Sequence, residues 1–114
     1  MTHHRIRKFN TKDTYPEQDL DNDLCQAVVT KGGRTVWMRD QCPQSLDDAK
    51  NIESHDPREQ THKVMQYIRQ LIKEAGGNMS HLVKLVVYIT DVRHREVIYR
   101  TMGAYIKGVY PVST

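Results

Sequence analysis

The sequence predicts a single α/β (α+β) domain with the element order ββαβα, in which two helices pack on one face of a sheet. Two observations predict this class. Amphipathic helical patterns cover residues 56–75 and 95–107, and apolar, β-rich runs lie before and between them, at residues 24–39 and 83–90. The chain has 114 residues, which is enough for one hydrophobic core and too few for two. We therefore expect one domain over residues 1–114.

The first expected elements are two strands joined as a β-hairpin. Residues 24–30 and 35–39 are rich in β-forming side chains. The linker between them contains Gly32 and Gly33, which adopt the positive φ of a tight turn without a steric cost. A hairpin of these two strands is therefore the predicted start of the sheet.

One short basic segment is expected to be solvated, and two longer polar segments are expected to be connections. The basic residues 5–8 have no apolar segment behind them and are expected to be solvated. Residues 10–23 contain Pro16 and five acidic side chains without periodicity, which is typical of a loop. Residues 40–55 form a second polar connection, and connections of this length are often functional.

Two amphipathic helices are predicted. The first begins at residues 56–59, Asp-Pro-Arg-Glu, which supply an N-cap carboxylate, a proline at the first helical position and the glutamate of a capping box. Its apolar residues recur at spacings of three and four until Gly76-Gly77 ends the pattern. The second helix covers residues 95–107 and is closed by Gly108.

A central strand is predicted at residues 83–90. Both alternating sets of its side chains are mostly apolar, which is typical of a strand covered on most of each face. A sheet with helices on one side leaves its other side in need of cover. The apolar share of the chain, 38%, is also low. These features favour association with further copies of the chain.

Charge and hydropathy argue against several classes of protein. Lysine and arginine exceed aspartate and glutamate by 17 − 14 = 3, and the two signs are mixed along the chain, which gives little support for nucleic-acid binding. No apolar run approaches the roughly 20 residues of a membrane span. The N-terminus lacks the apolar segment of a secretory signal. We expect a soluble, cytoplasmic protein.

Most catalytic motifs are missing from the sequence. The histidines show no metal-ligand spacing, and the Cys-x-x-Cys, Gly-x-Gly-x-x-Gly and phosphate-loop patterns do not occur. No serine lies in a strand-to-helix elbow motif. Cys25 and Cys42 are expected to be free thiols. We expect neither a metal nor an organic cofactor.

One segment has the residue types of an anion site. Arg39 lies at the end of a predicted strand, and Gln41 follows it in the long connection. A guanidinium group binds a carboxylate through two parallel hydrogen bonds, and the amide of Gln41 could orient the rest of a small ligand. A surface ion pair of Arg39 with Asp40 is the more common outcome of such spacing. The tyrosines at positions 88, 99 and 105 similarly fit core or oligomer contacts better than pocket walls.

Several motifs, in the same order, resemble the RidA/YjgF family of reactive-intermediate deaminases, also called the endoribonuclease L-PSP-like family. Residues 24–28 resemble its first hairpin strand, and Gln41-Cys42-Pro43 lies where the family has Gly-Gln-Ile-Pro. Residues 60–76 resemble its Gln-Thr…Ala-Gly helix, and residues 82–91 its Val-Val-Lys…Val-Tyr-Leu-x-Asp strand. Residues 110–114 lie where the family reads Phe-Pro-Ala-Arg-Ser.

The resemblance implies a chorismate-mutase-like fold, ββαβα(ββ), assembled as a homotrimer with a small-molecule site in each cleft between subunits. It implies hydrolysis of enamines or imines to 2-keto acids and ammonia without metal or cofactor. It also places Arg39, Gln41, Cys42, Tyr99, Ser113 and Thr114 at the substrate site.

The chain departs from the family at positions that matter for this chemistry. Ser113 occupies the position of the arginine that grips the substrate carboxylate, and Thr114 precedes the strand that carries a glutamate. We expect the chain to lack the final strand or strands of the family fold. Arg39 is a gained cation that we expect to replace the missing arginine in an atypical branch.

Three functions therefore stay open at this point. The first is an imine or enamine deaminase of altered substrate, with catalytic residues undetermined. The second is a non-catalytic member that binds a small metabolite, which the loss of the arginine favours. The third is ribonuclease or translation-inhibitor activity, for which the sequence offers neither paired histidines nor a basic stripe.

Overall fold

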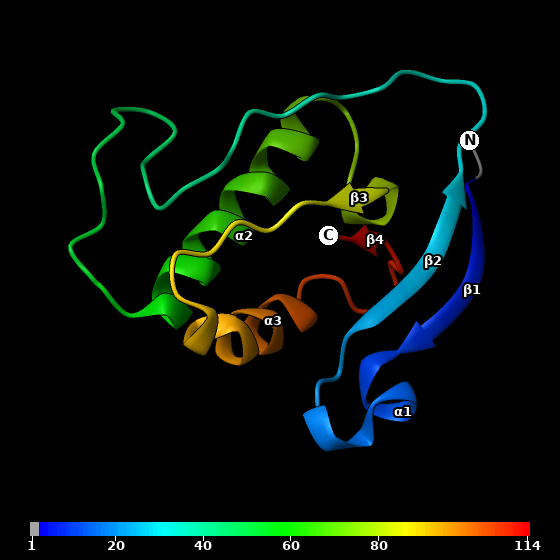
Figure 1. Ribbon diagram of the computed structural model, residues 1–114. Helices are drawn as coiled ribbons and strands as arrows, with labels where there is room; N and C mark the ends of the chain where they lie inside the picture. The colour runs from blue at the N-terminus through cyan, green and yellow to red at the C-terminus, as the bar shows by residue number, and fades with distance from the viewer. Residues whose placement is uncertain (1–2) are drawn as a thin grey trace.

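A computed structural model describes residues 3–114. Its helices are α1 (Thr11–Thr14), α2 (Pro57–Glu74) and α3 (Arg95–Gly103), and its strands are β1 (His4–Asn10), β2 (Asp23–Val29), β3 (Lys84–Leu85) and β4 (Val112–Ser113). Helices α2 and α3 lie together on one side of the strands (Figure 1). The molecule measures 39 × 38 × 18 Å, a thickness that fits one layer of helices on one layer of strands. The predicted mixed α+β class is confirmed.

The boundaries of α2 are those that its capping residues predict. The Asp56 carboxylate accepts a hydrogen bond from the Arg58 amide at 2.9 Å, and Pro57 is the first helical residue. Gly76 has a φ of 89°, and the Gly77 amide donates to the Ile72 carbonyl at 2.9 Å, so the last carbonyls of the helix are satisfied.

Helix α3 begins at Arg95 as predicted but ends at Gly103, before the predicted limit of residue 107. The Tyr105 amide bonds to the Met102 carbonyl at 2.9 Å, in a tighter turn than that of an α-helix. This turn carries Ile106 and Val109 into the core, where both are buried with residues of α2, β3 and α3.

The predicted hairpin of residues 24–30 and 35–39 is wrong. Strand β2 pairs antiparallel with β1, with Phe9 opposite Leu24, and residues 35–39 form no strand. The basic residues belong to β1. Arg7 and Lys8 are exposed as expected, whereas Arg5 is half-buried and its guanidinium donates to main-chain carbonyls. The predicted loop at residues 10–23 contains α1 and a 3₁₀ turn. Leu20, within this segment, is buried, with 1% of its surface exposed.

The predicted strand at residues 83–90 is shorter than expected. Regular pairing covers β3 alone, which runs parallel to β4, and one further bond joins the Val87 amide to the Thr114 carbonyl at 2.7 Å. Leu85 faces the core, whereas Val86 and Tyr88 are exposed by 48% and 81%. The expectation that both faces are covered is therefore wrong for the isolated chain, because no element within residues 3–114 covers Val86 and Tyr88.

The core lies between the helices and β3. Its buried residues are Met65, Leu85, Met102, Ile106 and Val109. Within residues 3–114 no helix has the length and apolarity needed to cross a lipid bilayer.

Candidate functional site

A cavity of about 440 Å³ opens between β2 and β4. Its wall consists mainly of β2 and the C-terminal residues, with single contributions from β1 and β3. The lining residues are Phe9, Leu24, Cys25, Gln26, Ala27, Val28, Lys84, Val112, Ser113 and Thr114. The volume is in the range of small-molecule sites.

The cavity lies where β2 and β4 run close together without pairing as one sheet. The Cys25 amide donates to the Pro111 carbonyl at 3.1 Å, and in the described part of the chain this is the one backbone hydrogen bond between β2 and residues 111–114. Backbone groups of an antiparallel strand alternate between its two edges, so the Ala27 amide lies on the same edge as that of Cys25. Unpaired main-chain groups at this edge are available to a ligand.

Strand β4 is fixed on its other side by β3. The Val112 amide donates to the Val83 carbonyl, and the Thr114 amide donates to the Leu85 carbonyl, both at 2.9 Å. Because β4 is held on this side, the gap toward β2 stays open.

The turn before β4 is held by side chains from the other end of the chain. The carbonyl of Tyr110 accepts hydrogen bonds from Arg5 Nη1 and Cys25 Sγ, each at 2.9 Å. Arg5 Nη2 also donates to the carbonyls of Ser80 and Leu82, at 3.1 and 2.9 Å. One guanidinium thus joins β1 to the segments that lead into β3 and β4.

Acidic residues at the start of β2 and just before it hold the same turn from its other end. Asp23 accepts a hydrogen bond from the Gly108 amide at 2.9 Å, and Lys107 Nζ lies 3.0 Å from the Asp21 carboxylate. Hydrogen bonds from Lys107, Asn10 and Lys12 lower the pKa of Asp21 to about 2. The carboxylates in this region are therefore engaged with the turn, outside the cavity.

The described lining of the cavity has one cationic side chain, that of Lys84, and two hydroxyl groups, those of Ser113 and Thr114. Lys84 is exposed and takes part in none of the ion pairs found among residues 3–114. Ser113 Oγ lies 3.2 Å from the Tyr99 hydroxyl, and the Arg95 guanidinium lies 4.8 Å from the centre of the Tyr99 ring. Among the described residues, no side chain of the lining carries a carboxylate or an imidazole. Such a wall can bind a small anion and hydrogen-bond to its polar groups.

The structure brings together half of the site residues expected from the sequence. Ser113 and Thr114 line the cavity, and Tyr99 contacts Ser113. Arg39, Gln41 and Cys42 do not line it. They lie in the connection between β2 and α2, where the Gln41 side chain donates to the Arg39 carbonyl at 3.1 Å.

Arg39 forms no ion pair with Asp40, nor with any other residue of the described chain. The role of Arg39, Gln41 and Cys42 in ligand binding stays a prediction.

Sequence reasoning missed Lys84 and Arg5. Lys84 is a charged residue inside an otherwise apolar alternating run, and that contrast was the available signal. Arg5 gave no signal, because its acceptors are main-chain carbonyls distant in sequence. Within residues 3–114 no three histidine, cysteine or acidic side chains lie close enough to hold a metal ion.

Comparison with known proteins adds a family match. The sequence model of the family described as Endoribonuclease L-PSP matches residues 22–114. A protein of unknown function from Yersinia pestis, YyfB of the conserved Rid protein family, superposes with a TM-score of 0.70 at 20% identity, over 99% of this chain and 82% of that protein.

Two further structures show the same fold. A candidate endoribonuclease L-PSP from Entamoeba histolytica gives a TM-score of 0.65 at 20% identity, over 79% of this chain and 70% of that one. A candidate endoribonuclease from Thermotoga maritima gives 0.60 at 16% identity, over 65% of this chain. The match spans 57% of the Thermotoga protein.

The Cys25 contact predicts different effects for the two cysteines. Both are free thiols, but Cys25 is 4% exposed and bonded to Tyr110, whereas Cys42 is exposed. We expect Cys25→Ala to lower the free energy of unfolding by about 1–2 kcal/mol, through a lost buried contact and a small cavity. Cys42→Ala, the matched control, should change it by less than about 0.5 kcal/mol. Urea unfolding followed by circular dichroism measures both, and equal effects would contradict the assigned role of Cys25.

Proposed function

Because the chain belongs to the Endoribonuclease L-PSP (Rid) family, we propose that its β2–β4 cavity binds a small imine or enamine that carries a carboxylate, and hydrolyses it to a keto acid and ammonia. The observation that carries the proposal is the wall of the cavity. This wall combines the positive charge of Lys84 with hydroxyl groups and unpaired strand edges, which are groups that can bind a small polar anion.

Lys84 is the proposed anchor for the substrate carboxylate. The resemblance to the RidA/YjgF family implies an arginine at position 113, but Ser113 is neutral. Lys84 lines the same cavity as Ser113 and supplies a positive charge there. An ammonium group holds a carboxylate as a point charge, without the two-pronged geometry of a guanidinium group.

The hydroxyl pair of Tyr99 and Ser113 is proposed to orient the reacting groups. Each hydroxyl can donate one hydrogen bond and accept others, so the pair can hold a water molecule or the imine nitrogen. An enamine first becomes the imine by gaining a proton on its terminal carbon and losing one from nitrogen. Water then adds to the carbon of the C=N bond, the C–N bond breaks, and the nitrogen leaves as ammonia while a C=O bond forms. One water molecule is consumed, and no electrons are transferred to or from the protein.

A second candidate is binding without turnover. Among the described residues of one subunit, no side chain of the cavity lining carries a carboxylate or an imidazole, the usual groups for general acid–base catalysis. A protein of this kind would hold the metabolite and leave it unchanged.

The Lys84 proposal predicts a charge-specific loss. With 2-aminoacrylate formed in situ, the wild-type chain should release ammonia above the spontaneous rate. Lys84→Gln should lower kcat/KM about tenfold, the lower end of the range for a charge-assisted hydrogen bond, because the ammonium group is exposed. Lys73→Gln, an exposed lysine at the end of α2, serves as the control and should leave the rate unchanged.

The same experiment separates the two candidates. Stabilisation of the fold by a small 2-keto acid, without any ammonia release from the imine, would favour the binding protein. The absence of both effects, or of any response to Lys84→Gln, would contradict the proposed site.

We further propose that the chain is a homotrimer whose contacts cover the outer face of residues 83–90. Val86 and Tyr88 are exposed there, and side-chain alternation places Lys84 on the same face. A large exposed apolar area of this kind is typical of an interface. Arg39, Gln41 and Cys42 remain the proposed ligand contacts supplied by a neighbouring subunit.

The trimer proposal predicts the behaviour of two glutamate variants. Tyr88→Glu should shift the sedimentation coefficient toward that of a monomer, because it places a charge in the proposed contact. Val92→Glu replaces another exposed apolar residue, 75% exposed, outside residues 83–90, and should leave the assembly intact. A wild-type chain that sediments as a monomer at micromolar concentration would overturn the trimer.

A further inference from the structure

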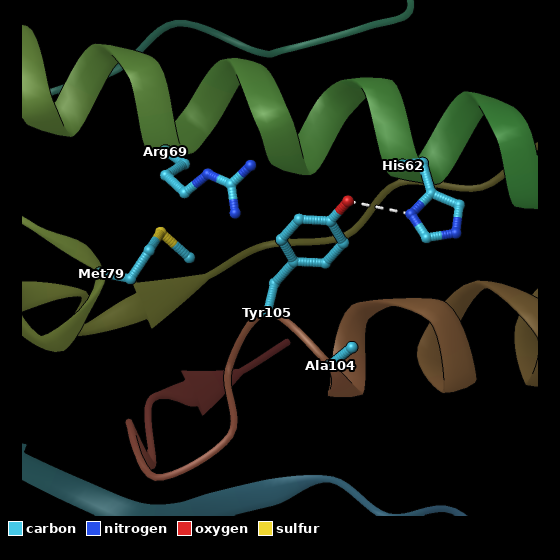
Figure 2. Close-up of a pocket in the computed structure, with 5 residues that line it drawn as sticks. All are labelled: His62, Arg69, Met79, Ala104 and Tyr105. Atoms are coloured by element: carbon cyan, nitrogen blue, oxygen red, sulfur yellow. Dashed lines mark hydrogen bonds between the residues drawn. The ribbon is translucent and has the colours of Figure 1, made fainter.

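A second cavity lies on the helical side of the molecule, between α2 and the turn that follows α3. Its volume is about 330 Å³, and its lining residues are His62, Arg69, Met79, Ala104 and Tyr105 (Figure 2). It shares no lining residue with the β2–β4 cavity. The function proposed above makes no use of it.

The helical period explains how α2 contributes to this cavity. His62 and Arg69 are seven residues apart, close to two turns, so they lie on one face of α2. Met65, between them, is buried in the core, so this face is directed toward α3. Tyr105 lies in the turn after α3 and points toward α2, with its hydroxyl group at His62 and its ring beside Arg69 (Figure 2).

With a neutral phenol on Tyr105, the His62–Tyr105 pair keeps a free hydrogen-bond donor in both neutral tautomers and in the imidazolium form of His62. His62 Nδ1 lies 2.9 Å from the Tyr105 hydroxyl oxygen. If Nδ1 accepts a hydrogen bond from the phenolic O–H, the imidazole carries its proton on Nε2, and this N–H is free to donate. If Nδ1 is protonated and donates to the phenolic oxygen, the phenolic O–H is free to donate. The imidazolium form leaves both of these donors free. A ligand that accepts hydrogen bonds therefore always finds a donor in this pair.

Arg69 supplies an uncompensated positive charge. Its guanidinium lies 5.5 Å from the centre of the Tyr105 ring and makes no hydrogen bond or ion pair with the described part of the chain. No carboxylate lines the cavity, and Lys73 lies one turn further along α2. The local charge is therefore positive, and the planar guanidinium group matches the geometry of a carboxylate.

The rest of the wall is apolar. Met79 lies on the same side of the Tyr105 ring as Arg69 (Figure 2), and its unbranched thioether adapts to flat apolar groups. Ala104 lines the cavity away from Arg69 and Met79, and its small side chain fills little space (Figure 2). A ligand for this wall needs an anionic group for Arg69 and a compact, flat apolar body.

We propose that the cavity between α2 and the turn after α3 binds a small aromatic carboxylate, with Arg69 on the carboxylate and the His62–Tyr105 pair as hydrogen-bond donor. The apolar ring of the ligand lies against Met79 and the Tyr105 side chain. This is a second site, on the helical side of the subunit, and its occupancy does not depend on the function of the β2–β4 cavity.

Benzoate is the probe for this site, and benzamide, with the same ring and no charge, is the neutral control ligand. Benzoate should shift the NMR signals of the His62 ring and of the Tyr105 ring, and titration calorimetry should show binding that benzamide lacks. Arg69→Gln should weaken benzoate binding about tenfold through the lost charge. Lys63→Gln, an exposed lysine of α2 outside the lining, removes the same charge and should leave binding unchanged.

Two further variants separate the possible outcomes. Tyr105→Phe keeps the ring, removes the hydroxyl group, and should weaken benzoate binding about threefold. Lys84→Gln alters the other cavity and should leave the benzoate-induced shifts of His62 and Tyr105 unchanged. The proposal is overturned if benzoate leaves these two rings unaffected, if benzamide binds equally well, or if Arg69→Gln and Lys63→Gln have the same effect.

Discussion

The carbonyl oxygen of Tyr110 is the point on which the arrangement of the C-terminal strand depends. It receives one hydrogen bond from Arg5 on β1 and one from Cys25 on β2. Two strands from the start of the chain therefore determine where its last strand begins. Asp23 fixes the same turn through the Gly108 amide, so main-chain and side-chain contacts together direct β4 along β2.

This constraint also explains why a cavity lies at this place. The segment that leads into β4 is joined to β2 by one backbone hydrogen bond, from Cys25 to Pro111, while β4 itself pairs with β3. Lys84 and Ser113 line the gap between the strands. A sheet paired along its full length would have closed the gap. The candidate site therefore depends on the incomplete pairing of the strands.

Local signals were readable from the sequence, and long-range pairings were not. The caps of α2 depend on neighbouring residues, such as Asp56 and Gly76, and both ends were predicted correctly. The partner of β2 is a strand of mainly basic and polar residues on the other side of residues 11–22, which no period marks as part of a sheet. In the site, Ser113 was predicted through family resemblance. Lys84 and Arg5 were not, because their importance comes from contacts that only the folded chain creates.

Hydrogen exchange at the amides of Val112 and Thr114 tests the role of the Tyr110 contact most directly. Both amides are bonded to β3, and we attribute their alignment to Arg5. In an Arg5→Met variant, the account predicts that their protection falls about tenfold or more, while protection within α2 persists. Unchanged protection of both amides in this variant would show that β4 keeps its place without the guanidinium, and would contradict the account.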